Sequence, residues 1–433
     1  QDEQWRSHQR GMGSCFASFS RGRAMRSPLQ ERVAEAAAGC SNDAALQAAL
    51  GLLVHADSIS RAPPFGRQRS TSSVLDALQY LRAVPGRIGL DIGATLAKMT
   101  FMQLSSECSL AQQLATMGRH HPELSFEVIL NDKPTLVHFI SGTTEKLGNM
   151  LMAHRRFPAV AQPRKVVASG GGAHRFANKM REVLNIEMLP LQEMESLVRG
   201  LDFLAEHGPE DELFTVGTEA TEVPAEWPSP VYPCLIVNMG SGVSILRIDE
   251  KGAGARKFVR LGGTACGGAT FLGLARLATS AASFSEALEL ARCGDPTRVN
   301  KLVRDIYGDD GCKDLGLPAT LTAVSFGKVG SDSTVPANAA GEADLAAALL
   351  LMVVQESTVL TRAYSQLVSM QIGRVPPVFF TGGFLVADNT VARRIIANSL
   401  RNLALGPALF LRHSDFLGAL GSLMQCVKNH SKK

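Results

Sequence analysis

The sequence predicts an α/β fold, and two observations support this. Strand-like apolar runs lead into glycine-bearing turns in three stretches, IGLDIGATLAKMTF (88–101), LIVNMGSGVSILRI (235–248) and VFFTGGFL (378–385). The intervals between these stretches hold helical patterns, in which apolar residues recur three and four positions apart. Strands that alternate with helices are typical of the α/β class.

The first two turns match each other, which predicts that the fold is a duplicated pair of lobes. Asp91 falls on Asn238 and Gly93 on Gly240, at an offset of 147 residues in both cases (238 − 91 and 240 − 93). We expect an N-terminal lobe over 88–233 and a C-terminal lobe over 234–433. The polar, proline-containing end of the first lobe, 208–233, is expected to form a loop beside a cleft.

The composition is that of a globular protein with a small-molecule partner. The chain has 433 residues, of which 45% are hydrophobic, so a sizeable core is expected. A net charge of +4 is too small and too evenly spread to predict binding to nucleic acid or a membrane surface. The longest apolar run, LAAALLLMVV (345–354), is shorter than the ~20 residues that span a bilayer, which favours a buried helix.

The compartment and the N-terminal extension rest on weaker patterns. The 8 cysteines are scattered without a Cys-x-x-Cys pair, which favours a reducing, cytoplasmic location. We expect residues 1–87 to form a largely disordered extension. Between Gln4 and Gln30 it has five arginines and no acidic residue, so a mitochondrial transit segment is the alternative.

The glycine turns suit the phosphates of a nucleotide. Two such turns facing each other across a cleft present backbone N–H groups to phosphate oxygens. We expect Asp91 to hold Mg²⁺, directly or through water, and Lys98 to offset phosphate charge. From this hairpin alone, a turn-capping carboxylate and a solvated lysine are equally good interpretations. Gly382 and Gly383 in the third turn leave room for adenine and ribose.

Two further stretches repeat the pattern of a glycine loop before a helix. VVASGGGAHRFANKM (166–180) runs from a strand into three glycines, so helix N-terminal amides should lie at the cleft. RLGGTACGGATFLGLARL (260–277) places Arg260 before a loop of Gly, Ala and Thr. Because each glycine in such a stretch costs roughly 0.5–1 kcal/mol unless it is needed, a ligand loop is the favoured interpretation.

With these motifs in place, residues 87–424 resemble the eukaryotic-type (type II) pantothenate kinases, within the actin and hexokinase superfamily. The resemblance is carried by GLDIGATLAKM, ASGGGAHRF, QEMESLVRGLDFL, VNMGSGVSIL, GGTACGGATFLGLARL and ALFLRHSDFLGALGSL. It implies a duplicated, ribonuclease H-like fold with an ATP cleft between the lobes. It also implies transfer of the ATP γ-phosphate to the terminal hydroxyl of pantothenate, the first step toward coenzyme A.

The resemblance assigns roles to individual residues. It implies that Glu193 is the general base, that Arg260 binds the substrate carboxylate near the transferred phosphate, and that Ser241 contacts pantothenate. Without it, Glu193 and Glu195 would be taken as acids on a helix surface. The remaining implied contacts are Gly263, Thr264 and Ala265 for substrate, Asp91 for metal, and Gly93, Ala94, Thr95, Lys98, Gly171, Gly172, Gly240, Ser241, Gly242, Gly382 and Gly383 for nucleotide.

The resemblance also bears on regulation and assembly, and two other functions are possible for the chain. The resemblance implies inhibition by acetyl-CoA or another acyl-CoA, and a homodimer or a heterodimer with a paralogue. The apolar helix 343–367 is the candidate dimer surface, with a wholly buried core helix as the alternative. Ala94, Ala265 and Ala269 replace the usual Gly, Ser and Gly of the family, so a non-catalytic subunit of an active paralogue is a second hypothesis. A kinase for another hydroxylated acid or sugar is a third.

Overall fold

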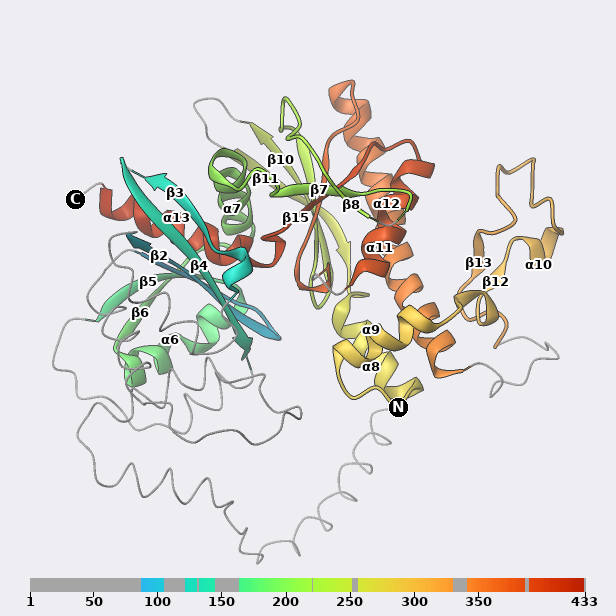
Figure 1. Cartoon of the computed structure of the whole chain (residues 1–433), viewed down its shortest axis with the longest axis horizontal. Helices are drawn as coiled ribbons and strands as arrows, with labels where there is room; N and C mark the ends of the chain where they lie inside the picture. Colours follow the sequence, from blue (N-terminus) through green and yellow to red (C-terminus); the bar gives the residue numbers. More distant parts are fainter. Residues whose placement is uncertain are drawn as a thin grey trace, which may run out of the picture.

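Two β-sheets, one in each lobe, organise the chain (Figure 1). The computed structural model describes residues 87–104, 121–130, 132–144, 163–219, 221–250, 256–329, 341–385 and 389–431. Apart from Arg87, the expected N-terminal extension lies outside the described residues, so its disorder stays a prediction.

The first sheet has the strand order β3-β4-β2-β1-β5-β6. Its strands are β1 (Ile88–Ile92), β2 (Leu96–Leu104), β3 (Phe126–Leu130), β4 (Lys133–Thr143), β5 (Arg164–Ser169) and β6 (Ile186–Pro190). β1 pairs antiparallel with β2 and parallel with β5. Helix α6 (Gly171–Leu184) connects β5 to β6, which pair in parallel.

The second sheet has the strand order β11-β10-β9-β14-β15-β7-β8. Its strands are β7 (Leu213–Val216), β8 (Glu222–Pro224), β9 (Cys234–Met239), β10 (Val243–Glu250), β11 (Arg256–Thr264), β14 (Val378–Thr381) and β15 (Ala408–Leu411). β9 pairs antiparallel with β10 and parallel with β14. β14 in turn pairs parallel with β15.

The two sheets confirm the duplicated α/β fold. In each, the central strand has an antiparallel hairpin partner on one side and two successive parallel strands on the other. The matching turns also keep the predicted offset, since β1 ends at Ile92 and β9 at Met239, and β2 begins at Leu96 and β10 at Val243. Both lobes therefore have the ribonuclease H-like order that the resemblance implied.

The segment expected to be a loop at 208–233 contains strands β7 and β8, so that expectation was wrong in part. Leu213 and Phe214 are buried because β7 pairs with β15 at the edge of the second sheet. A run as short as LFTV, surrounded by Pro, Gly and acidic residues, has too few residues to predict a strand. The edge strands β7 and β8 of the second sheet therefore precede residue 234, where the C-terminal lobe was expected to begin. The limits of the lobes stay a prediction.

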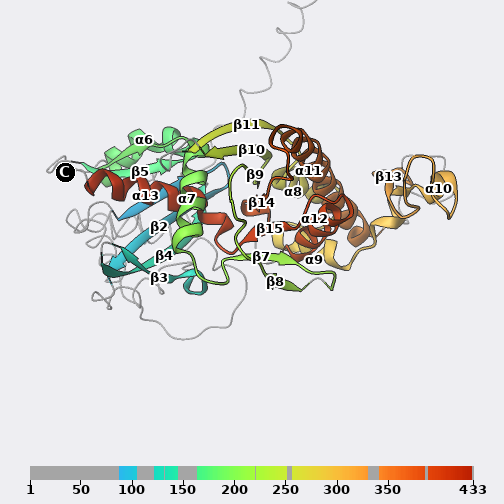
Figure 2. The same ribbon diagram turned by 90° about the horizontal axis from the view of Figure 1, so that it is seen from above.

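Helices α7 (Glu193–His207) and α13 (Leu417–Ser431) lie between the two sheets (Figures 1 and 2). Their buried side chains share one core with residues of both sheets, such as Phe139 of β4 and Ile236 of β9. Glycine permits their close crossing, because a Cβ on Gly421 would lie 1.9 Å from the carbonyl oxygen of Ser196. These helices join the two lobes through packed apolar contacts.

The remaining elements cover the second sheet or project from it. The long helix α11 (Glu342–Ile372) packs against the other helices on the second sheet and buries Leu350, Val353 and Val354. This burial confirms the expected buried helix. Among the described helices, α11 is long and apolar enough to cross a membrane when it is judged by length and composition alone. The others are α8 (Gly268–Ala278), α9 (Phe284–Cys293), α10 (Arg304–Tyr307), α12 (Thr390–Asn402), β12 (Lys301–Leu302) and β13 (Thr322–Val324), with short 3₁₀ turns η2 (Pro122–Leu124), η3 (Pro296–Arg298), η5 (Gly383–Leu385) and η6 (Ser414–Phe416). β12, α10 and β13 form a projection beyond α11 (Figure 2).

Candidate active site

The turns of the two matching hairpins meet. The hydroxyl oxygens of Thr95 and Ser241 are 3.1 Å apart, and this hydrogen bond joins the first lobe to the second. Each turn is closed by a backbone bond, from the Gly93 N–H to the Leu96 carbonyl and from the Gly240 N–H to the Gly242 carbonyl, both at 2.9 Å. The structure therefore brings together the two small-residue turns that the sequence singled out.

Asp91 and Lys98 lie next to each other on the first hairpin. They are cross-strand partners in the register of β1 and β2. The Ser169 hydroxyl donates a hydrogen bond to the Asp91 carboxylate at 3.0 Å, and Lys98 forms an ion pair with Asp415 at 3.8 Å. Burial raises the pKa of Asp91, a shift that Lys98 and Ser169 oppose and the negative charge of Asp415 reinforces. Asp91 is therefore a carboxylate that a bound cation would stabilise.

Two glycines leave room for the Asp91 carboxylate. Gly170, at the start of α6, has a φ of +80°, and a Cβ there would lie 2.9 Å from an Asp91 carboxylate oxygen. A Cβ on Gly418 of α13 would lie 2.7 Å from the Asp91 carboxyl carbon. Of the predicted phosphate contacts on the same loop, Gly171 is exposed with open space beside it and Gly172 packs on Ile92.

Glu193 is the first residue of α7 and is exposed. Partial removal from water and the negative charge of Asp91 both raise the pKa of Glu193. The neighbouring Glu195 is engaged elsewhere, since the Arg199 guanidinium pairs with it at 2.6 Å. The two acids of QEMESLVRG therefore differ, since Glu195 is held in an ion pair whereas burial and the charge of Asp91 raise the pKa of Glu193.

The third glycine turn, after β14, lies close to Asn238 and Lys98. Thr381, at the end of β14, pairs with Asn238 of β9, and Gly382 follows with a φ of +101°. A Cβ on Gly382 would lie 2.6 Å from the Asn238 side-chain oxygen, so glycine permits this turn to pass the β9 end closely. An added Cβ on Gly383 would lie 3.8 Å from the Lys98 ammonium nitrogen. The first and third turns thus meet at Lys98, and the second turn adjoins the first through Thr95 and Ser241.

Arg260 and its loop lie beside the second hairpin turn. Thr264 pairs with Val243 in the register of β10 and β11, and Arg260 follows a register shift in the same pair of strands. Arg260 is exposed, and its Nε lies 3.5 Å from the Ser244 hydroxyl. A Cβ on Gly263 would lie 2.8 Å from an Arg260 guanidinium nitrogen, so this glycine leaves space for the side chain.

The start of α8 uses its amides to hold the second turn. The Gly268 N–H donates to the Gly240 carbonyl at 2.8 Å, and the Ala269 N–H donates to the Ser241 carbonyl at 3.1 Å. These two donors are therefore not available to a phosphate. Ala265 and Ala269 are exposed, and Ala94 has no positive φ, so none of the three alanines is strained.

Asp415 is a site residue that sequence reasoning missed. It lies in η6, immediately before α13, and contacts Lys98. Its Oδ1 is buried and accepts no hydrogen bond from the described residues. The motif ALFLRHSDFLGALGSL contains Asp415, yet nothing in its spacing links it to a lysine more than three hundred positions earlier.

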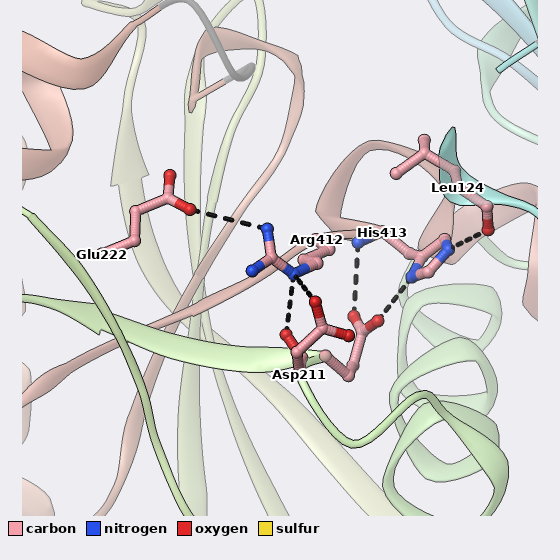
Figure 3. Close-up of polar contacts among 6 residues, drawn as sticks. Leu124, Asp211, Glu222, Arg412 and His413 are labelled. Carbon is pink, nitrogen blue, oxygen red and sulfur yellow. Dashed lines mark hydrogen bonds and ion pairs between the residues drawn. The ribbon is translucent and has the colours of Figure 1, made fainter. Parts of the chain in front are cut away.

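Two residues before Asp415, His413 fixes this turn to both lobes (Figure 3). Its Nδ1 bonds the Glu212 carboxylate, and its Nε2 lies 2.6 Å from the Leu124 carbonyl oxygen. A carbonyl can only accept, so Nε2 donates. The other Glu212 oxygen accepts from the His413 backbone N–H at 3.2 Å. Glu212 and His413 are 0% and 2% exposed, so this pair is buried.

The neighbouring Arg412 points toward Asp211 and Glu222 instead (Figure 3). Its guanidinium pairs with Asp211 at 2.8 Å and with Glu222 at 3.5 Å. These side chains are 37–59% exposed, so this is a surface network. In the segment 412–415, Arg412 is therefore a surface cation, His413 is a buried imidazole, and Asp415 is the acid that pairs with Lys98.

Asp91 is the carboxylate of the site that could contribute to binding a metal ion. In the part of the chain that the structure describes, no group of three or more His, Cys, Asp or Glu side chains could hold a metal ion. Mg²⁺ commonly binds through one or two carboxylates, with water and phosphate oxygens completing its shell. Asp91, with its raised pKa, is the residue that fits this role.

Comparisons with known proteins identify the family. The Fumble family model matches residues 87–425. The chain is 33% identical over 364 residues to "Pantothenate kinase 2" of Oryza sativa subsp. japonica, covering 79% of this chain and 38% of that protein. It is 32% identical over 356 residues to "Pantothenate kinase" of Schizosaccharomyces pombe, covering 78% and 81% of the two chains.

One solved structure and the lengths of the relatives complete the comparison. A glucokinase from Balamuthia mandrillaris aligns over 84% of this chain and 100% of its own, with 10% identity and a TM-score of 0.38. The chain spans about two fifths of the length of "Pantothenate kinase 2" of rice and of "Pantothenate kinase 2" of Arabidopsis thaliana. With the family model spanning nearly all described residues, this chain belongs to the Fumble family.

Proposed function

We propose that this chain is an ATP-dependent pantothenate kinase, a phosphotransferase with an alcohol group as acceptor. Relatives named pantothenate kinase support the proposal, as does membership of the Fumble family. The observation that carries it is the meeting of the two glycine hairpin turns through Thr95 and Ser241, with Asp91 and Lys98 paired across the first hairpin. Partial burial and the charge of Asp91 raise the pKa of Glu193, which supports its proposed role as the base.

In the proposed reaction, the protein positions and neutralises charge. Lys98 and the backbone amides of the three turns bind the triphosphate, and Asp91 would hold Mg²⁺. When bound, Mg²⁺ offsets negative charge on the phosphate oxygens. Glu193 accepts the proton of the pantothenate hydroxyl as its oxygen bonds to the γ-phosphorus and the bond from that phosphorus to the departing ADP breaks. Arg260 binds the substrate carboxylate, a task that suits a planar guanidinium with several donors.

Glu193→Gln tests the proposal, with Glu195→Gln as the matched control. Both changes remove one negative charge from the first turn of α7, but Glu195 is held in an ion pair with Arg199. Loss of a general base lowers kcat by about 10²–10⁴-fold. Transfer of phosphate from ATP to pantothenate, followed with the isolated chain, should fall in this range for Glu193→Gln only. Equal rates for Glu193→Gln and wild type would contradict the assignment.

The same assay separates the other hypotheses. Turnover by the isolated chain would exclude a non-catalytic subunit that needs an active paralogue. A panel of hydroxylated acids and sugars at fixed ATP would reveal a different acceptor. Arg260→Ala should be at least as damaging as Glu193→Gln, because a loose transition state depends more on charge and position than on proton removal.

We further propose a dimer, inhibition by acetyl-CoA or another acyl-CoA, and a cytoplasmic location. The C-terminal half of α11 supports a dimer surface, because Val359, Leu367 and Met370 are 65%, 43% and 78% exposed. These residues lie at helical spacing on one face. Sedimentation of the purified chain tests the dimer, and the phosphate-transfer assay with added acetyl-CoA tests the inhibition.

A further inference from the structure

Lys98 lies between carboxylates from two distant parts of the chain. Its backbone is opposite Asp91 on the first hairpin, and its ammonium nitrogen is 3.8 Å from Oδ1 of Asp415. The Lys98 and Asp415 side chains are 11% and 20% exposed, so little water screens their interaction. Asp415 is therefore a strong electrostatic partner for the lysine proposed to bind phosphate.

The fold holds Asp415 in place independently of Lys98. His413 is anchored to Glu212 of the second lobe and to Leu124 of the first, two residues before Asp415. Immediately after Asp415, buried Phe416 and Leu417 pack into the core between the sheets. The carboxylate is thus presented to Lys98 by a turn that is fixed on both sides.

Hydrogen bonds do not satisfy this carboxylate oxygen. Oδ1 of Asp415 is buried and accepts none from the described residues, so the ammonium of Lys98 provides its compensation. The charge of Asp415 also raises the pKa of Asp91. Two carboxylates therefore neighbour one cation at the place where the first and third glycine turns meet.

A phosphate that binds at Lys98 must draw the lysine away from the Asp415 carboxylate. It must also approach the negative charge of Asp91. At short range in a partly buried site, such interactions are several times stronger than in water. The cost of binding a phosphate therefore depends on whether residue 415 is charged.

We propose that Asp415 is a built-in counterion for Lys98 that competes with the nucleotide phosphates and lowers the affinity of the site for them. This proposal rests on the proposed kinase function and deepens it. Asp415 is a positioning residue, because it acts on the nucleotide through Lys98. By weakening phosphate binding, it favours release of the product nucleotide.

A metal-binding role for Asp415 would have the opposite consequence. Loss of a metal ligand weakens binding of a nucleotide with Mg²⁺, whereas loss of a competing counterion strengthens binding of a nucleotide without it. Titration calorimetry with ADP, in EDTA and separately in Mg²⁺, distinguishes the two. ADP binding needs no catalysis, so the measurement is independent of pantothenate turnover.

The central variant is Asp415→Asn, which keeps the shape and removes the charge. We expect it to tighten ADP binding in EDTA by at least about fivefold at low ionic strength, with a smaller effect in high salt. Asp415→Glu retains the charge and should stay within about twofold of wild type. Asp310→Asn is the matched control, since Asp310 pairs with Lys313 at 3.7 Å but is 86% exposed on the projection around α10. It should leave ADP affinity unchanged.

Each outcome decides the proposal. Unchanged or weaker ADP binding by Asp415→Asn overturns it, and weakening confined to Mg²⁺ would assign Asp415 to the metal instead. If wild type binds no ADP, the proposed kinase function fails together with this inference. If wild type binds ADP and Asp415→Asn binds it equally well, only the inference fails. Asp415→Ser, a residue suited to a helix start, repeats the test if the Asn variant does not fold.

Discussion

Replacing His413 with alanine removes one partner of a buried pair that joins the two lobes. The Glu212 carboxylate is 0% exposed and would lose the imidazole Nδ1, retaining the His413 backbone N–H as a donor. The Leu124 carbonyl would lose its donor at 2.6 Å. The ring also packs against Phe126 and Phe139, with centroids 5.0 and 4.6 Å away.

The expected cost follows from this burial. Removing one partner of a buried hydrogen-bonded pair leaves the other group unsatisfied, which costs about 1–3 kcal/mol, and the cavity left by the missing ring adds to this cost. Glu212→Gln should cost less, roughly 1–2 kcal/mol, since an amide keeps the shape and can still bond the ring. The double variant Glu212→Leu with His413→Phe should cost less than its two single changes together.

Urea unfolding followed by far-ultraviolet circular dichroism measures these free energies. Arg412→Ala is the control, because its pairs with Asp211 and Glu222 are on the surface and should contribute about 1 kcal/mol or less. A cost below about 1 kcal/mol for His413→Ala, or strict additivity in the double variant, would refute the reasoning.

Two further predictions concern Glu193 and the helix crossing. Since a base works deprotonated and the pKa of Glu193 is raised from 4.5, the acid limb of kcat/KM should lie above pH 4.5; a limb below it would contradict the assignment. A raised pKa means that the ionised form of Glu193 destabilises the folded state. Glu193→Gln should therefore stabilise the ligand-free fold at neutral pH, and this gain should fade as the pH falls through the raised pKa. Gly421→Ala should destabilise by roughly 2 kcal/mol or more, because its Cβ would meet Ser196 at 1.9 Å. Gly273→Ala, with open space on the exposed face of α8, should be neutral or stabilise by up to about 1 kcal/mol in the same urea assay, and equal costs would refute the steric argument.

Local patterns allowed the first parts of the fold to be predicted. A strand, a glycine turn and a second strand are neighbours in sequence, so alternation and turn residues suffice to place Asp91, Lys98 and the two matching hairpins. The offset between Gly93 and Gly240 persists in the strand ends that the structure shows. For Glu193, the helix pattern alone indicated a surface acid, and the family resemblance supplied the role.

Partners far apart in sequence were beyond such patterns. β7 pairs with β15 across about two hundred residues, so the strand character of 213–216 depends on an edge that is built later in the chain. Glu212 meets His413 over a separation of 201 residues. Neither contact leaves a periodicity, because each exists only after the intervening chain has packed.

The sequence by itself therefore determined the duplicated hairpins, the glycine turns and the residues available for phosphate chemistry, since these depend on backbone preferences over a few positions. Only the tertiary structure decided that α7 and α13 lie between the sheets, that Glu195 is held by Arg199, and that Asp415 faces Lys98. The physical reason is that a charge acts on whatever the fold places within a few ångströms of it, regardless of distance along the chain.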